Sequence, residues 1–371
     1  MGDASTDAAP GFRDVPRAAL VTGAGGFVGR RLVEMLVERG AKRVVAFDVA
    51  PPPADALEHP AVQYVTADIR DKAAVADACR DVDCCFHIAA LVGPYHEESA
   101  YEAVNTGGTL HVLDGCRQHG VPKLVMSSSP STRFPYPDPN VRGLTEDALA
   151  EINGGPYSPQ FHATYAATKA KGERAVLDAC SEELRTIAVA PHQVYGPRDP
   201  LFMPSILDAA RGGKLRVFGS GDNLISLTHV DNYCHGLILG AEALHSGSEA
   251  QGRFYIVTDG GAHKFWDALD RAITGVGLPT IKNRRALPAW FMLIVARVVM
   301  ALAHTIAFVT RRPFPHVMRR LKLNTFAVRM MVIDRYFDIS AAERDLHYVP
   351  LMSFDEGWAD MIAWFRQREP A

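Results

Sequence analysis

A glycine-rich turn near the start of the chain limits the possible folds more than any other feature. The turn follows an apolar run, Ala18–Thr22, and opens an amphipathic stretch, Phe27–Arg39. The first pattern predicts a strand and the second a helix. The glycines are spaced GxxGxxG, which lets the backbone approach a pyrophosphate at the helix N-terminus. The residues predicted to contact a dinucleotide here are Gly23, Gly26, Phe27 and Gly29.

The same alternation of strand and helix continues along the first half of the chain. It predicts the α/β class, with a Rossmann-type, doubly wound parallel sheet. The predicted strands are Ala18–Thr22, Arg43–Phe47, Val62–Thr66, Asp83–Ile88, Lys123–Ser127 and Leu184–Ala190. Residues 130–159 hold six prolines and three glycines, so a long loop over the sheet is predicted there.

The length of 371 residues suggests more than one domain. Residues 1–17 lack an apolar run and are predicted to be a disordered leader. Residues 18–190 are predicted to form the dinucleotide-binding Rossmann domain. Residues 191–371 are predicted to form a smaller, mixed substrate-binding lobe, part of which can return to the Rossmann sheet.

Charge and cysteine content exclude several classes of function. The chain has 39 Lys and Arg against 42 Asp and Glu, so no overall basic field attracts nucleic acid. The six cysteines lack a paired CxxC spacing, which argues against a zinc site and against a disulfide framework. We therefore expect no metal site, no nucleic-acid partner and a reducing compartment.

Acidic residues at the ends of two predicted strands bear on the choice of cofactor. Asp48 ends the second strand, where a carboxylate accepts hydrogen bonds from the adenine ribose and repels a 2′-phosphate. NAD is therefore the predicted cofactor, with NADP left open. Asp68 and Ile69 follow the third strand and are predicted to meet the adenine, although an aspartate there also suits a helix cap.

Three polar side chains farther along form a predicted catalytic group. Tyr165 and Lys169 are four residues apart in a helical stretch, so they share one helix face. A nearby ammonium favours the phenolate, so we expect Lys169 to lower the pKa of Tyr165 and Tyr165 to act as a base. Ser129 ends a run of three serines at the end of the fifth strand and is predicted to hold the substrate oxygen, with Ser128 as the alternative.

Together these motifs resemble the extended short-chain dehydrogenase/reductase family. The glycine turn, the serine run and the Tyr-x-x-x-Lys pair are joined by His87–Ala90 (His-Ile-Ala-Ala) and Asn105–Thr109 (Asn-Thr-Gly-Gly-Thr). In that family the first segment lies near the cofactor, and the segment that begins at Pro191 lines the nicotinamide pocket. The residues that the resemblance places at the cofactor are Ala89, Tyr165, Lys169 and Pro191.

Within that family the chain is most similar to the 3β-hydroxysteroid dehydrogenase branch, and there to the decarboxylating sterol-4α-carboxylate 3-dehydrogenases. The segments that carry this narrower resemblance are Pro191–Pro200, Met203–Pro204 with Ala209–Lys214, Thr228–Asn232, and the late apolar segment followed by Tyr336–Ser340. It implies NAD(P)-dependent oxidation of a sterol 3β-hydroxyl in sterol biosynthesis, with decarboxylation of a 4α-carboxysterol to the 3-ketosterol. Three alternatives stay open: a 3β-hydroxysteroid dehydrogenase/Δ5-4 isomerase, a nucleotide-sugar epimerase or reductase, and a non-catalytic membrane-associated nucleotide-binding protein.

A late apolar run, residues 286–310, is of membrane-span length and is interrupted only by Arg297 and His304. Arg297, His304 and Arg311 are seven residues apart and share one helix face, which suits a helix lying in the membrane interface. A spanning helix and a buried helix of the substrate lobe stay open. We expect a membrane-associated enzyme acting on a sterol or steroid, at the endoplasmic reticulum if the source is eukaryotic, with its catalytic domain facing the cytosol. A homodimer is left open.

Overall fold

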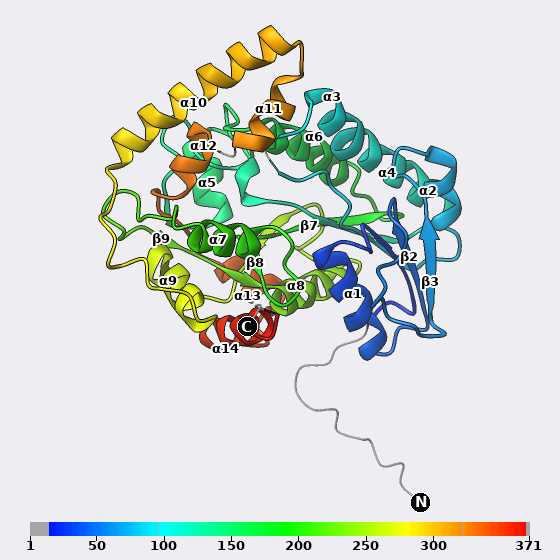
Figure 1. Ribbon diagram of the computed structural model, residues 1–371. Coiled ribbons are helices and arrows are strands. Elements are labelled where there is room, and N and C mark those ends of the chain that lie inside the picture. The colour runs from blue at the N-terminus through cyan, green and yellow to red at the C-terminus, as the bar shows by residue number, and fades with distance from the viewer. Residues whose placement is uncertain (1–14, 94, 322, 369–371) are drawn as a thin grey trace, which may run out of the picture.

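A parallel sheet of seven strands lies at the centre of the molecule (Figure 1). The computed structural model describes residues 15–368, except 94 and 322. The strand order is β11-β7-β5-β4-β1-β2-β3. The bounds are β1 Ala18–Thr22, β2 Arg43–Asp48, β3 Val62–Thr66, β4 Cys84–His87, β5 Lys123–Ser127, β7 Arg185–Pro191 and β11 Phe254–Val257. The predicted Rossmann-type sheet is confirmed, and the six predicted strands agree to within one residue at either end.

Helices cover both faces of this sheet, because its strands are apolar on both sides. One face is covered by α1 (Phe27–Glu38) and α8 (Val230–Ala243). The other face is covered by α2 (Lys72–Ala78), α4 (Gly108–His119) and α6 (Thr164–Asp178). Neighbouring residues of one strand therefore enter different cores, as the two-residue period of a strand requires.

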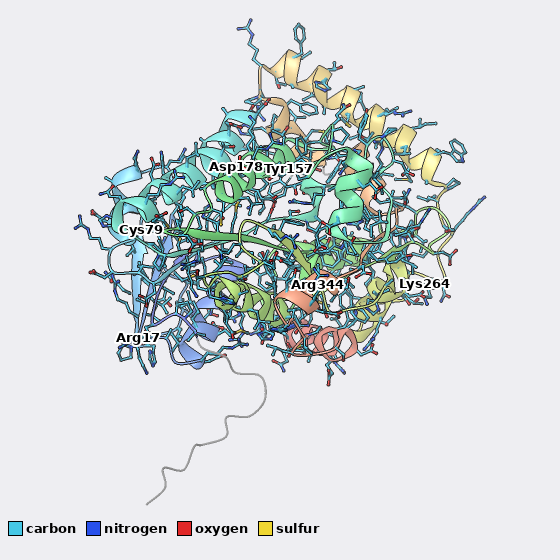
Figure 2. All side chains as sticks on the ribbon, turned by 180° about the vertical axis from the view of Figure 1, so that it is seen from behind. Arg17, Cys79, Tyr157, Asp178, Lys264 and Arg344 are labelled. Carbon is cyan, nitrogen blue, oxygen red and sulfur yellow. The ribbon has the colours of Figure 1, made fainter. Side chains whose placement is uncertain are left out.

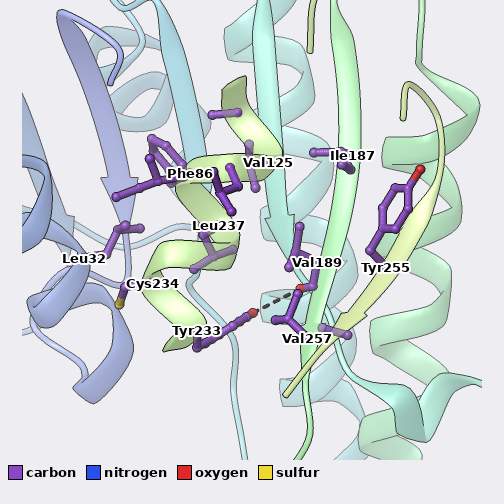
Figure 3. Close-up of a cluster of buried hydrophobic side chains, with 14 of the residues drawn as sticks. Leu32, Phe86, Val125, Ile187, Val189, Tyr233, Cys234, Leu237, Tyr255 and Val257 are labelled. Atoms are coloured by element: carbon purple, nitrogen blue, oxygen red, sulfur yellow. Dashed lines mark hydrogen bonds between the residues drawn. The ribbon is translucent and has the colours of Figure 1, made fainter. Parts of the chain in front are cut away.

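Figure 3 shows part of the core between α8 and the sheet. The Tyr233 hydroxyl on α8 lies 3.1 Å from the carbonyl oxygen of Val189 and 2.7 Å from Ser127 Oγ. Leu237, one turn later, is fully buried in the same cluster. Helix α8 is thus joined to β5 and β7, although it comes from the second half of the chain.

A second, smaller sheet and a separate core form the remaining lobe. This sheet has the order β12-β9-β13-β6, and β8 pairs with β10 beside it. The bounds are β6 Val141–Leu144, β8 Val194–Tyr195, β9 Leu224–Ile225, β10 Thr228–His229, β12 His263–Lys264 and β13 Arg335–Phe337. The helices of this lobe include α7 (Phe202–Arg211), α9 (Phe265–Gly275) and α14 (Phe354–Arg366). The fully buried Trp358 joins α14 to α9, because its Nε1 donates to the Ala268 carbonyl at 3.1 Å.

The prediction of a long loop over residues 130–159 is wrong. This stretch contains β6 and α5 (Glu146–Asn153). Thr145 Oγ1 accepts a hydrogen bond from Ala148 N at 3.2 Å, and Gly154 ends the helix with a φ of +66°. The breaker residues therefore act as helix ends, and the buried Leu149 fixes the helix between them.

The boundary predicted at residue 190 separates parts of the chain that share one sheet. Strand β11 pairs with β7, and α8 packs beside α1. The division into a Rossmann domain and a substrate lobe stays a prediction. The predicted leader lies outside the described residues, except for its last three, of which Val15 packs against the core.

Helix α10 (Ala289–Thr310) lies along an outer edge of the molecule, apart from the main sheet (Figures 1 and 2). It begins three residues after the start of the predicted apolar run. The helices α11 (Phe314–Leu321) and α12 (Thr325–Met330) pack against it. The remaining elements are α3 (Glu98–Tyr101), a π-helical turn at 102–107, a 3-10 turn at 130–132 and α13 (Ser340–Asp345).

Candidate active site

The glycine turn between β1 and α1 leaves no room for side chains. Gly23 has a φ of +73°, and a Cβ added there would lie 2.8 Å from the backbone of Ala89. A Cβ on Gly29 would lie 2.0 Å from the Gly23 carbonyl oxygen. Gly26 is the N-cap of α1, and no side chain caps the first N–H groups of that helix. Together with Phe27, the first residue of α1, these residues form a cradle that suits a pyrophosphate.

Asp48 ends β2 beside this turn. Its carboxylate accepts hydrogen bonds from Gly25 N at 3.0 Å and from Ala50 N at 2.9 Å. The negative charge is therefore fixed next to the glycine cradle, where it suits ribose hydroxyls and opposes an added phosphate.

Asp68 and Ile69 follow β3. Asp68 is paired with Arg70, and this hydrogen bond lowers the pKa of the Asp68 carboxyl. Ile69 is buried, and its side chain fills the space beside Gly108. The capping role weighed for Asp68 belongs to Asp71, whose side chain accepts hydrogen bonds from two N–H groups of α2. Contact of Asp68 and Ile69 with an adenine stays a prediction.

Ala89 and Pro191 stand at the carboxyl ends of their strands. Ala89 N donates to Thr22 Oγ1 at 3.2 Å, next to the glycine turn, and Pro191 is the last residue of β7. His87 is buried between Thr22 and Thr109, with hydrogen bonds of 2.8 and 2.9 Å. Burial lowers the pKa of His87 to about 3, so this histidine is a neutral packing residue.

Lys169 on α6 contacts the end of β5. Its Nζ donates to the carbonyl oxygen of Ser127 at 2.6 Å. Burial lowers the pKa of Lys169 to about 8, against the opposing charge of Glu173. Because Ser129 follows Ser127 by two residues, this contact brings the Tyr-x-x-x-Lys face of α6 to the serine run.

Tyr165 lies one turn before Lys169 and packs edge-to-face on Tyr101, with ring centroids 6.5 Å apart. Burial, with a smaller contribution from Tyr101, raises the pKa of Tyr165 to about 12. In this structure the direction is opposite to the predicted lowering by Lys169. The reason is that the Lys169 ammonium is held by the Ser127 carbonyl while the phenol is desolvated.

The serines of the run differ in their surroundings. Ser128 is buried, and its hydroxyl donates to the Glu173 carboxylate. Ser129 is half-buried, and its Oγ lies 2.9 Å from Ser131 Oγ. Since a bond between two hydroxyls reorients more easily than one to a buried carboxylate, these contacts favour Ser129 over Ser128 as the substrate-binding hydroxyl.

Glu173 and Tyr101 are site residues that no motif singled out. Glu173 is fully buried one turn after Lys169 and is paired with Arg133, with 2.6 Å between Nη2 and Oε1. This pair and Ser128 tie α6 to the loop that carries Ser129. The spacing of four from Lys169 is a sequence signal for Glu173. Tyr101 has no such signal, because its contact with Tyr165 arises only from the fold.

The cradle, Asp48, the α6 face and the serine run gather at the carboxyl edge of the parallel sheet, where open α/β folds bind ligands. The residues fit a dinucleotide, since the cradle admits a pyrophosphate and no side chain caps the helix beside it. A phenol, an ammonium and a hydroxyl in one partly buried site are suited to moving a proton to or from an alcohol. Within 15–368, less the two undescribed positions, no cluster of three His, Cys, Asp or Glu could hold a metal ion.

Comparisons with known proteins agree with this chemistry. The model of the 3-beta hydroxysteroid dehydrogenase/isomerase family matches residues 20–288. The 3beta-hydroxysteroid-dehydrogenase/decarboxylase isoform 1 of Arabidopsis thaliana is 32% identical over 93% of this chain and 78% of its own length. The decarboxylating sterol-4-alpha-carboxylate 3-dehydrogenase of Homo sapiens is 31% identical over 93% of this chain and 87% of its own length. The 2-alkyl-3-oxoalkanoate reductase of Stenotrophomonas maltophilia is 32% identical over 91% and 96%, respectively.

Solved structures of nucleotide-sugar enzymes share the fold. The UDP-glucuronic acid 4-epimerase from Bacillus cereus, in complex with NAD, has a TM-score of 0.70 at 20% identity and covers 95% of this chain and 100% of its own. MoeE5, in complex with UDP-glucuronic acid and NAD, has a TM-score of 0.69 at 23% identity, with the same coverage. At these identities the likeness concerns the fold alone.

Proposed function

Because the chain belongs to the 3-beta hydroxysteroid dehydrogenase/isomerase family, we propose that it oxidises the 3β-hydroxyl of a sterol with NAD as the hydride acceptor. The predicted family and the predicted class, an oxidoreductase, are confirmed by the match to that family. The finer part of the proposal is that the sterol carries a 4α-carboxylate, which is lost as carbon dioxide. Several relatives are named for that decarboxylating activity.

The observation that carries the proposal is the hydrogen bond from Lys169 Nζ to the Ser127 carbonyl. It holds the helix with Tyr165 against the strand end that leads to Ser129. The glycine cradle lies at the same edge of the sheet and Asp48 stands beside it, which supports NAD over NADP. A dinucleotide and an alcohol thus have neighbouring places in one site.

In the proposed reaction Ser129 donates a hydrogen bond to the substrate oxygen, and Tyr165 takes the hydroxyl proton. NAD, held by the glycine cradle and Asp48, would supply the acceptor for the hydride from carbon 3. For Tyr165 to act at neutral pH, its pKa must fall from about 12, which requires a positive charge nearer the phenol. Lys169 supplies that charge if it leaves the Ser127 carbonyl, and it is then also placed to hold the nicotinamide ribose.

Decarboxylation then needs no further catalytic group. The new carbonyl at carbon 3 is β to the carboxylate, so the bond between carbon 4 and the carboxyl carbon breaks and carbon dioxide leaves. The electron pair of that bond enters an enolate, which Ser129 and Tyr165 stabilise by hydrogen bonds. A proton added at carbon 4 completes the 3-ketosterol.

A second candidate function follows from the bacterial relative, a 2-alkyl-3-oxoalkanoate reductase of equal identity. Its substrate is a β-keto acid with a substituent between the two carbonyl carbons. A 4α-carboxysterol, once oxidised, has the same arrangement. The two functions differ in direction and in the body of the substrate. Both use Ser129, Tyr165 and Lys169, with Tyr165 taking a proton in the oxidation and donating one in the reduction.

We also propose that the enzyme works at a membrane, because its substrate is apolar and the long helix α10 is largely exposed. Within an 18-residue apolar stretch of α10, only 17% is buried inside the protein. This exposure argues against a core helix of the substrate lobe. If the source is eukaryotic, we propose that this membrane is the endoplasmic reticulum and that the catalytic domain faces the cytosol.

Mass spectrometry of products from a carboxyl-labelled 4α-carboxysterol tests the function. The full chain with NAD should release labelled carbon dioxide and NADH in equal amounts, and Tyr165→Phe should release neither. NADH without label release would reject decarboxylation. Turnover of a 2-alkyl-3-oxoalkanoate with NADH, and none of the sterol, would favour the second candidate. A Δ4-3-ketosteroid formed from a Δ5 substrate would favour the isomerase.

A further inference from the structure

Helix α10 has the reverse of the usual surface pattern. The residues of α10 that are buried against the protein are Met292, Ala296 and Ala303, and the two alanines are fully buried. Many of its large apolar residues point outward instead: Phe308 is 87% exposed and Trp290 is 65% exposed. The exposed row runs along the helix through Trp290, Ile294, Val298, Leu302, Ile306 and Val309. A continuous exposed apolar face of this kind marks an interaction surface.

The charged residues around this face are all basic. Residues 283–333 contain nine Lys and Arg and no Asp or Glu, which leaves 30 basic and 42 acidic residues in the rest of the chain. Eight of the nine are described arginines, and none of these is in an ion pair with a described carboxylate. The surface formed by α10, α11 and α12, here called the α10–α12 surface, is therefore apolar along α10, and its described charged residues are all basic, with Arg297 midway along the helix.

We infer that the α10–α12 surface docks on an anionic lipid leaflet, with α10 lying in the plane of the membrane and not crossing it. Exposed apolar side chains enter the acyl region while the flanking arginines meet lipid phosphates. A second copy of the chain is a poor partner, because a two-fold contact would bring basic residues against each other with no acidic residue to pair them.

The packing of α10 opposes a membrane-spanning orientation. A spanning helix meets lipid on all sides over about 30 Å. One side of α10 is instead covered along its length, by Val328 near its start and by Val317 and Met318 near its end. Just before the helix, the backbone of Leu287 forms hydrogen bonds with the backbones of Val217 and Gly219. The start of α10 is therefore anchored to the smaller lobe.

The docking surface adjoins the candidate active site. Tyr95, in the loop after β4, packs in the cluster that joins α10 to α11. Arg319 donates to the Tyr95 carbonyl at 3.0 Å. From there a chain of ring contacts leads through His96 and Tyr101 to Tyr165. Docking would thus bring the candidate active site close to the lipid. The use of this position to take up substrate rests on the proposed function, whereas the lipid contact itself does not.

Vesicle flotation of the full chain tests the docking without any substrate. We expect at least ten-fold stronger binding to vesicles of phosphatidylcholine with 30% phosphatidylserine than to phosphatidylcholine alone. Leu302→Ser with Phe308→Ser, or Arg311→Gln with Arg312→Gln, should each reduce binding at least ten-fold. The matched controls Val349→Ser, 69% exposed on another surface, and Arg117→Gln should bind as the unchanged chain does.

Binding to both vesicles with equal strength, or binding unaffected by these variants, would overturn the inference. Absence of vesicle binding, with a dimer that Leu302→Ser dissociates, would assign the surface to a second copy. Tryptophans introduced by Leu302→Trp and Phe308→Trp should both be quenched by lipids brominated at shallow positions; deep quenching of the first alone would indicate a spanning helix. Vesicle binding without sterol oxidation would defeat the proposed function and leave the docking intact.

Discussion

At the scale of single residues, burial drives two titratable groups of α6, Tyr165 and Lys169, toward their neutral forms. It lowers the pKa of Lys169 to about 8 and raises that of Tyr165 to about 12. The proposed reaction needs the opposite pair, an ammonium and a phenolate. A positive charge that enters the site therefore acts on both groups. It favours the phenolate form of Tyr165 and disfavours the ammonium form of Lys169.

Replacing Tyr165 by Phe removes the titrating hydroxyl and little else. We expect kcat to fall by about 10²- to 10⁴-fold, the usual range for a lost general base, with NAD affinity nearly unchanged. Lys169→Met should reduce both, and Tyr101→Phe, which keeps the ring against Tyr165, serves as the control. Steady-state kinetics and NAD titration measure the two effects. Retention of more than a few per cent of kcat by Tyr165→Phe would mean that another base operates.

The Asp48 carboxylate should decide between the two nicotinamide cofactors. It is fixed by Gly25 N and Ala50 N beside the glycine cradle, where a 2′-phosphate would be repelled. We expect the unchanged enzyme to have a higher kcat/KM with NAD than with NADP. Asp48→Ala should reduce the ratio of these two values at least ten-fold. Measured preference for NADP in the unchanged enzyme would contradict this assignment.

Two buried histidines predict how stability depends on pH. Burial lowers the pKa of His87 and of His192 to about 3. Between pH 7 and 5 the unfolded chain takes up protons at these positions and the folded chain does not, so stability falls as the pH falls. Each histidine should contribute a loss of about 2 kcal/mol in the free energy of unfolding over that interval.

The pH effect is checked by urea unfolding at pH 7 and pH 5. His192→Gln should be less stable at pH 7 but should lose about 2 kcal/mol less than the unchanged chain on acidification. His59→Gln, at an exposed position, is the control and should keep the full loss. An unchanged pH dependence in His192→Gln would show that this ring also charges in the folded protein.

At the scale of elements, the parts that the sequence predicted best are those with contiguous apolar runs. The sheet strands are buried on both faces, so their pattern is strong and their bounds were found to within a residue. Helix α5 was missed because its signals, Thr145 and Gly154, lie among prolines that favour a loop. Glu173 and Arg133 were missed as a pair because forty residues separate them and only the packing of α6 on the loop joins them.

Gly29 tests the glycine cradle as an element. A Cβ there would lie 2.0 Å from the Gly23 carbonyl oxygen, so Gly29→Ala must displace the start of α1 from the turn. We expect at least ten-fold weaker NAD binding and a loss of about 1–3 kcal/mol in stability. Gly155→Ala is the matched control, because nothing lies within 4 Å of its added Cβ. Equal NAD affinity for both variants would remove the cradle from the cofactor site.

At the scale of the whole molecule, the chain leaves the main sheet after β7 and returns to it with α8 and β11. Strand β11 supplies the neighbour of β7 at the sheet edge. Helix α8 covers the face on which Phe86, Val125 and Ile187 lie in the shared core (Figure 3). The second half of the chain therefore completes the core of the first, and a boundary at residue 190 cuts through one hydrophobic core.

We therefore predict that residues 15–191 do not fold alone. The fragment keeps six strands of the main sheet but exposes the face that α8 covers, which includes the fully buried Val125, Ile187 and Val189. Such an uncovered apolar face should bind a hydrophobic dye and should give no cooperative urea transition, whereas residues 15–368 should unfold cooperatively. Circular dichroism and dye fluorescence of both chains measure this. A cooperative transition in the short fragment would instead make residue 190 the end of an independent domain, with α8 and β11 as later additions to a finished core.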